Sequence, residues 1–207
     1  MAFPMLAGTF AMNAYNLADT WFVSRLGTQA LAAMGFTFPV IMLLTCIAGG
    51  IGTGVTTLVS HAIGRREQSA AARLTTHGLL LTMMISIVIA LAGCLTIEPI
   101  FRRLGADART LPLVAAYMRT WYIGAFTMAL PMIGNGILIS CGDSRAASQF
   151  MILGTVLNVI LDPIMIFGCL GFPAMGIKGA ALATVISQAV STAWLFWLLY
   201  RKHRLLR

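Results

Sequence analysis

Six long apolar stretches follow one another along the 207 residues of this chain. Bounded by charged and turn-forming residues, they cover residues 3–24, 30–62, 74–97, 111–140, 146–168 and 177–200. A helix needs about 20 residues to cross the roughly 30 Å hydrocarbon core of a bilayer, and every stretch reaches that length. The pattern predicts an all-α integral membrane protein with six transmembrane helices.

The composition excludes an ordinary soluble domain. Hydrophobic residues make up 59% of the chain and charged residues only 10%, whereas soluble domains carry about 25% charged residues. A soluble fold cannot hide so much apolar surface from water. The two longest stretches each contain a proline, Pro39 or Pro131. Because an interior proline removes a helix hydrogen bond, we expect these two helices to bend there.

The net charge of +8 raises the question of a nucleic-acid partner. The basic residues lie in the short connections and form no single face, so we expect no nucleic acid. One set of alternate connections carries Arg65, Arg66, Arg73, Arg145, Arg201, Lys202, Arg204 and Arg207. The other carries Arg25, Arg102, Arg103, Arg109 and Lys178, with Arg119 near the start of the fourth stretch. Since basic residues favour the cytoplasmic side, the excess predicts a multi-pass protein of the cytoplasmic (inner) membrane with both ends in the cytoplasm.

The glycine, cysteine and histidine patterns indicate helix packing rather than chemistry. GGIGTG at 49–54 lacks the preceding strand of a phosphate-binding loop, and GIKGAALAT at 176–184 places small residues four apart on one helix face. Both patterns are typical of membrane helices that pack closely. No ligand spacing joins Cys46, Cys94, Cys141, Cys169, His61, His77 and His203. We therefore expect no cofactor and no disulfide framework.

Two carboxylates lie where membrane helices seldom carry charge. Asp19 and Asp162 fall inside apolar stretches, where an ionised side chain costs on the order of 3 kcal/mol. Asn158 precedes Asp162 by one helical turn, so both side chains point to one side. Pro163 is expected to bend the helix and free the carbonyl of Val159. Carboxylate, amide and carbonyl oxygens together predict a site for a proton or a cation such as Na⁺, with Asp19, Asn158 and Asp162 as candidate ligands.

The first stretch also carries a polar stripe. At helical spacing it contains Thr9, Asn13, Asn16 and Thr20, with Asp19 beside them. A polar stripe inside a membrane helix faces protein or a water-filled cavity. We therefore place Tyr15, Asn16 and Thr20 in a candidate substrate cavity. The alternative is that the two aspartates only cap helices or hold them together.

Five segments occur in an order that supports a family resemblance: YNLADTWFVSRLGTQALAAMG, GTGVTTLVSHAIGRRE, CGDSRAA, NVILDP and MGIKGAALATVIS. Together they resemble the amino-terminal half of the multidrug and toxic compound extrusion (MATE) family of transporters, over essentially the whole chain. The resemblance implies that residues 1–207 form one six-helix lobe of a twelve-helix transporter and that the carboxy-terminal lobe is absent.

The same resemblance implies an antiporter in which H⁺ or Na⁺ moves inward while organic, often cationic, drugs or toxic compounds are exported. In the prokaryotic branch that this chain looks most like, the ion-coupling residues are an aspartate of helix 1, an Asn–Asp pair of helix 5 and a threonine of helix 6. Asp19, Asn158 and Asp162 match by motif, and Thr184 is the best-placed threonine. The implied partners are small organic cations or other xenobiotics, membrane lipid, and either the missing second lobe or a second copy in a homodimer.

Three alternatives stay open. A flippase for lipid-linked saccharides of the same superfamily would need arginines along its cavity, and Arg119 is the only candidate within a stretch. An intramembrane aspartyl enzyme would use the two aspartates as an acid–base dyad, but no nucleophile or metal cluster accompanies them, so we expect no enzyme. A structural membrane subunit would lose only stability when both aspartates are neutralised.

Overall fold

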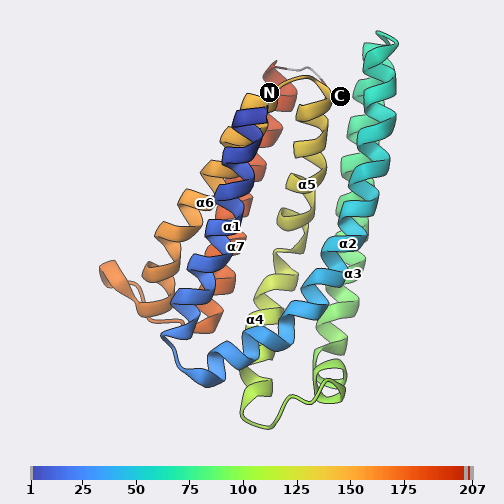
Figure 1. The fold of residues 1–207 in the computed structure, drawn as a ribbon. Coiled ribbons are helices and arrows are strands. Elements are labelled where there is room, and N and C mark those ends of the chain that lie inside the picture. The colour runs from blue at the N-terminus through green and yellow to red at the C-terminus, as the bar shows by residue number, and fades with distance from the viewer. Residues whose placement is uncertain (1, 203–204, 206–207) are drawn as a thin grey trace.

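The computed structural model describes residues 2–202 and residue 205, which are mostly helical (Figure 1). The helices are α1 (Ala2–Ser24), α2 (Thr28–Gly64), α3 (Gln68–Arg103), α4 (Thr110–Ile123), α5 (Ala125–Ser140), α6 (Ser144–Phe167) and α7 (Ile177–Trp197). Two short elements complete them, a 3₁₀ turn η1 (Cys169–Gly171) and a π-helical turn η2 (Leu198–Lys202). No strand occurs within the described residues. The predicted all-α fold is confirmed.

The number of membrane spans depends on α1. Four helices are long and apolar enough to cross a membrane: α2, α3, α6, and α7 with η2. α4 and α5 qualify together as a fifth span, bent by 53°. The stretch predicted as the first span forms α1, which has 23 residues, but Asn13, Asn16 and Asp19 lower its hydropathy below that of the others. The membrane fold is confirmed, and the passage of α1 as a sixth span stays a prediction.

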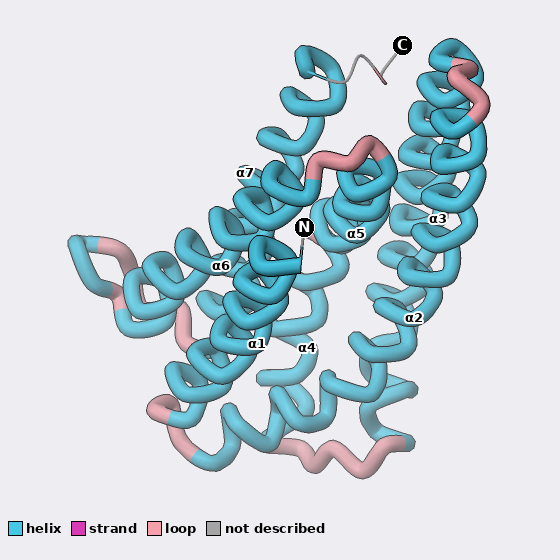
Figure 2. Tube along the Cα trace, turned by 45° about the horizontal axis from the view of Figure 1, so that its top comes forward, coloured by secondary structure: helices cyan, strands magenta, loops and turns pink. Residues whose placement is uncertain are grey.

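Successive helices alternate in direction, except that α5 continues α4 in the same direction, and they form two packed groups (Figure 1). α1 packs against α6 and α6 against α7, while α2, α3 and α5 form the second group. α4 contacts α2, α3 and α7, and α5 also contacts α7, so these two helices join the groups. Figure 2 shows that the loops lie mainly at the ends of this arrangement. Two apolar cores hold it together, one around Val114 and Met118, the other around Ile133 and Ile137.

The break in the fourth predicted stretch lies at Gly124 and not at Pro131. Thr127 donates its N–H at 2.9 Å and its hydroxyl at 2.7 Å to the Gly124 carbonyl, which tightens the turn. A Cβ atom at position 124 would overlap the side chain of Val185, so only glycine allows this approach to α7. Pro131 lies inside the continuous helix α5. The break at Gly124 is an addition to the prediction, set by the close contact with α7, and a bend of α5 at Pro131 stays a prediction.

Pro39 and Pro163 also lie inside continuous helices, α2 and α6. Since proline has no N–H, the Val159 carbonyl lacks its usual helical donor. The helix nevertheless continues to Phe167. Membrane helices tolerate proline in this way when neighbouring groups compensate. α6 thus continues through Pro163 without a break, and the bend expected there stays a prediction.

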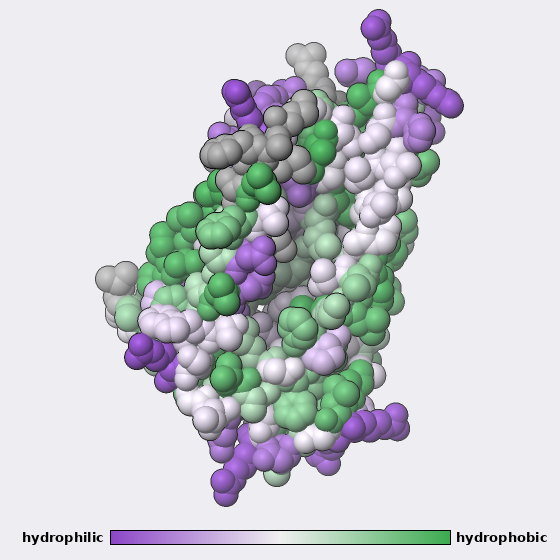
Figure 3. Space-filling model, in the orientation of Figure 1, coloured by the Kyte–Doolittle hydropathy of each residue, from purple (hydrophilic) through white to green (hydrophobic). Residues whose placement is uncertain are grey.

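The exposed surface is charged at two ends and largely apolar between them (Figure 3). The α2–α3 and α5–α6 connections, with Arg66 and Arg145, lie at the end where α7 finishes (Figure 1). The α1–α2 and α3–α4 connections, with Arg25 and the neighbouring Arg102, lie at the opposite end. The prediction that both chain ends lie in the cytoplasm depends on this grouping of the connections into two ends. The side of the membrane that each end faces stays a prediction.

Candidate functional site

α6 and α7 approach each other closely through small residues. A Cβ atom on Gly179 of α7 would overlap the backbone carbonyl of Met165 on α6. A Cβ atom on Gly154 of α6 would lie 2.9 Å from Oγ of Ser191 on α7. The close packing predicted for the GIKGAALAT segment is confirmed. It brings Thr184 of α7 against the inner face of α6.

Asn158, Asp162 and Thr184 form a hydrogen-bonded group in the interior, where they are 1%, 0% and 4% exposed. The orientation of the Asn158 amide is assigned from its partners. With its nitrogen toward Asp162, Asn158 donates to Oδ2 at 3.0 Å and accepts from the Thr184 hydroxyl at 3.2 Å. Tyr15 of α1 joins the group, with its phenol oxygen 3.4 Å from Oγ1 of Thr184. Three helices thus bring these four sequence-predicted residues together.

Asp19 supplies a second buried carboxyl from α1. It is 4% exposed, and α1 packs along α6. Asp19 and Asp162 lie within electrostatic reach of each other, so two negative charges here repel. In each carboxyl, Oδ1 is buried and has no hydrogen-bond partner. Because buried polar atoms nearly always have a partner, these two oxygens mark a place for an additional group.

Tyr117 of α4 completes the surroundings of this site, and the sequence gives no hint of it. The residue is 5% exposed, and its phenol lies within electrostatic reach of Asp19 and Asp162. In the sequence it begins the run YMRTWY, where an aromatic side chain is ordinary. The signal comes from the fold alone, because α4 packs against α7.

Asn16 and Thr20 lie on the exposed face of α1. The Thr20 hydroxyl donates to the Asn16 carbonyl at 2.8 Å, and the amide of Asn13 donates to the Thr9 carbonyl at 2.9 Å. Figure 3 shows a hydrophilic patch over α1, between the charged ends. These residues form an open polar face beside the buried carboxyls. Their place in a substrate cavity stays a prediction.

The buried group is suited to hold one positive charge. A proton on either carboxyl would give an unpartnered oxygen a hydrogen to donate, and a Na⁺ ion would take oxygen ligands such as the two Oδ1 atoms. In the assigned orientation the Asn158 nitrogen holds the Asp162 carboxyl and its oxygen accepts from Thr184, and its role as a ligand of the ion stays a prediction. Within residues 2–202 and 205, no three His, Cys, Asp or Glu side chains form a metal-binding group.

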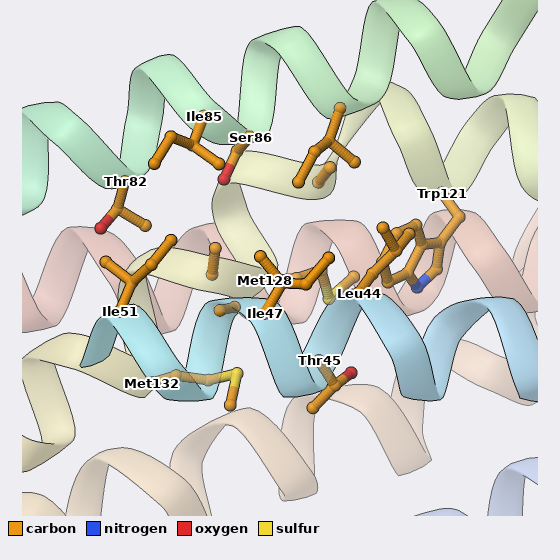
Figure 4. Close-up of a pocket in the computed structure, with 14 residues that line it drawn as sticks. Leu44, Thr45, Ile47, Ile51, Thr82, Ile85, Ser86, Trp121, Met128 and Met132 are labelled. Carbon is orange, nitrogen blue, oxygen red and sulfur yellow. The ribbon is translucent and has the colours of Figure 1, made fainter. Parts of the chain in front are cut away.

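A pocket of different character lies between α2, α3, α4 and α5 (Figure 4). Apolar side chains such as Ile51, Trp121 and Met128 form most of its wall, and none of its lining residues is charged. Two of its hydroxyls bond within their own helices: Thr45 donates to the Ile41 carbonyl and Thr82 to the Gly78 carbonyl, both at 2.8 Å. Unlike the site at Asp162, this pocket has no charged side chain in its lining that would balance an ion.

Comparison with known proteins assigns the chain to a family. Residues 4–164 match the MatE family. The chain is 43% identical over 206 residues to the FAD transporter of Shewanella oneidensis, which covers 100% of this chain and 46% of that protein. It is 31% identical over 204 residues to the probable multidrug resistance protein YoeA of Bacillus subtilis, covering 98% of this chain and 44% of that protein.

Solved structures show the same fold. A MOP superfamily transporter from Pyrococcus furiosus has a TM-score of 0.88 and 36% identity, covering 96% of this chain and 43% of the other. An outward-facing multidrug resistance MATE family transporter also has a TM-score of 0.88 and 36% identity, covering 97% and 44%. The chain therefore spans less than half the length of these relatives. By family match, sequence identity and fold, this chain belongs to the MATE family of membrane transporters.

Proposed function

We propose that this chain forms one lobe of an ion-coupled MATE antiporter that exports organic compounds across the cytoplasmic membrane. The observation that carries the proposal is the pair of buried carboxyls, Asp19 and Asp162. They come from different helices, lie within electrostatic reach of each other, and each keeps one unpartnered oxygen. Ionisable residues at membrane depth mark ion pathways and proton relays. The pair supplies a charge that changes when a proton or Na⁺ arrives.

Coupling follows from the two charge states of this pair. When both carboxyls are ionised, their repulsion favours movement of α1, which carries Asp19, away from α6. A proton or Na⁺ removes the repulsion and favours the packing of α1 on α6 seen here. An ion shifts such an equilibrium only by its differential affinity for the two arrangements. Because the same helix presents Asn16 and Thr20 on its open face, ion and substrate compete through the position of α1.

Organic cations and FAD are the two substrate candidates. Relatives named as multidrug resistance or multidrug export proteins support drug-like compounds. The relative with 43% identity is a FAD transporter and is matched by the whole of this chain, which supports the second candidate. FAD is a large anion with aromatic rings, whereas a drug-like cation carries the opposite charge. Whether excess FAD inhibits the uptake of a cation therefore distinguishes the two candidates.

A single lobe lacks the surface against which it would move. In transporters built from repeated halves, alternating access moves one half against the other around a midplane site. The relatives are more than twice as long as the part that this chain covers. We infer that a second six-helix lobe, or a second copy of this chain, faces the open polar side of α1, with both ends of the present chain in the cytoplasm.

The test measures uptake of ethidium into inside-out vesicles under an imposed H⁺ or Na⁺ gradient. The vesicles carry this chain alone or fused to the second half of the FAD transporter relative. We expect gradient-dependent uptake to fall by about 100-fold in Asp162→Asn, equivalent to about 2.7 kcal/mol in the transition-state free energy. Glu98→Gln is the matched control, because Glu98 is an exposed carboxyl that pairs with Arg102 at 3.6 Å. It should transport normally.

Each competing function predicts a different result in these vesicles. Unchanged ion dependence in the double variant Asp19→Asn with Asp162→Asn would refute coupling at this site and favour a structural subunit. A saccharide-lipid flippase predicts no ethidium uptake under either gradient. Excess FAD that blocks ethidium uptake, followed by direct uptake of FAD itself, would identify FAD as the substrate. The gradient that drives uptake identifies the coupling ion.

A further inference from the structure

Three helix connections in this chain end in the same hydrogen-bonded turn. After α2, Glu67 N–H donates to the Ala62 carbonyl at 3.0 Å and Arg66 N–H to the Ile63 carbonyl at 2.9 Å. The same pair of bonds follows α3, from Ala106 and Gly105, and follows α5, from Asp143 and Gly142. All three are the helix ending in which one residue takes a left-handed backbone conformation.

The residue in the left-handed position differs among the three turns. Gly105 has φ 94° and Gly142 has φ 77°, whereas Arg66 has φ 61°. Among the described residues Arg66 is the one non-glycine with positive φ. L-residues with a Cβ atom are disfavoured in this conformation, and the hydrogen bonds of the turn use only the backbone. The turn itself therefore gives no reason for an arginine, and the reason has to lie in its side chain.

The surroundings of Arg66 combine charge with apolar surface. Arg66 lines a pocket with Ile63, Gln68, Ala71, Cys141 and Leu205. Of these, Leu205 is only 3% exposed and closes one side of the pocket, while Ile63 is half-buried and offers apolar surface. Figure 3 shows hydrophilic atoms gathered over the α2–α3 turn at the upper right, above the apolar part of the surface. The α2–α3 turn that carries Arg66 thus lies at the charged end, next to the apolar part of the surface.

The acidic groups nearby do not neutralise this pocket. Within the described residues, the ion pairs join Lys202 to Asp143 and Arg102 to Glu98, so neither includes Arg66. Asp143 also accepts the N–H of Ala146 at the start of α6, which occupies its other oxygen. Glu67 is the acidic residue of the turn itself, and Arg65 on the other side of Arg66 balances its charge.

We propose that Arg66 and this pocket bind the phosphate of an anionic phospholipid headgroup. A guanidinium group pairs with phosphate through two parallel hydrogen bonds, and Gln68 offers an amide donor beside it. Ile63 supplies apolar surface for the start of the acyl chains. Basic pockets at the membrane surface recognise anionic headgroups. The excess of arginine and lysine at this end of the molecule favours such a lipid over a zwitterionic one.

The experiment measures the rise in melting temperature of the detergent-purified full chain as short-chain lipid is added. The probes are dihexanoyl phosphatidylglycerol, dihexanoyl phosphatidylcholine and inorganic phosphate. Arg66→Gly is the decisive variant, because glycine suits the left-handed position and misfolding is not expected. We expect its melting temperature without lipid to equal or exceed that of the unmodified chain. Its apparent affinity for phosphatidylglycerol should fall at least fivefold.

Two controls separate a lipid site from general charge. Arg103→Gln removes a charge at the opposite end of the molecule and should leave the affinity for phosphatidylglycerol unchanged, while Arg66→Gln should weaken it as Arg66→Gly does. Equal affinity in Arg66→Gly and the unmodified chain would overturn the proposal. Phosphate that binds as tightly as phosphatidylglycerol would overturn the assignment to a lipid, because the apolar surface would then contribute nothing.

Discussion

In the pocket between α2, α3, α4 and α5, Thr45 and Thr82 donate to carbonyls of their own helices. At the carboxyl site, by contrast, Tyr15 of α1 and Asn158 of α6 both form hydrogen bonds to Thr184 of α7. The first arrangement satisfies each hydroxyl locally and is indifferent to the position of neighbouring helices. In the second, Tyr15 and Thr184 meet only when α1 and α7 are correctly placed. Two carboxyl oxygens of that region also remain without partners.

This difference shows why similar membrane burial leads to different chemistry. A hydroxyl that donates to its own backbone has used its hydrogen within one helix, although its oxygen can still accept. A hydrogen bond between two helices forms only when the helices are correctly placed. An unpartnered carboxyl oxygen can in addition bind a cation. The region around Asp162 is therefore suited to convert ion binding into helix movement, and the region around Thr82 is suited to rigid packing.

The largest expected effect comes from separating the helices that hold the carboxyl site. Gly179→Leu inserts a side chain where the Met165 carbonyl already lies, and we expect it to destabilise the fold by about 3 kcal/mol. Gly54→Leu is the matched control, because Gly54 of α2 has no atom within 4 Å of its Cβ position. Thermal unfolding in detergent measures both. Equal melting temperatures would show that α6 and α7 do not need their close approach.

A smaller effect is expected when one polar side chain is removed from each region. Asn158→Leu removes the donor to Asp162 and the acceptor for Thr184, and we expect a loss of about 1–2 kcal/mol together with altered ion dependence of transport. Thr82→Val removes a hydroxyl whose bond is internal to α3. It should change the melting temperature and transport little. If Thr82→Val proved as harmful as Asn158→Leu, the contrast between the two regions would be wrong.

The sequence predicted those features that depend on local pattern. Apolar runs located the helices, and the cost of charge in a membrane singled out Asp19 and Asp162. The turn-length spacing of Asn158 and Asp162 placed both side chains on one face, as found. By contrast, the break at Gly124 depends on Val185, about sixty residues away in the chain, so no rule applied to the local sequence could locate it.

The sequence could not identify Tyr117 as part of the carboxyl site. Its substitution tests how far that site extends beyond the helices that carry the sequence-predicted residues. Its phenol lies within electrostatic reach of both carboxyls, so Tyr117→Phe keeps the ring and its packing but removes a dipole beside the ion. We expect an unchanged fold and a shift of about two- to fivefold in the ion concentration for half-maximal transport, equivalent to about 0.4–1 kcal/mol. Tyr122→Phe is the control, because Tyr122 is a buried aromatic residue of the same helix whose electrostatic neighbour is Cys94 rather than the carboxyls. Equal ion dependence in the two variants would show that Tyr117 is not part of the site. The site would then consist of residues of α1, α6 and α7 alone.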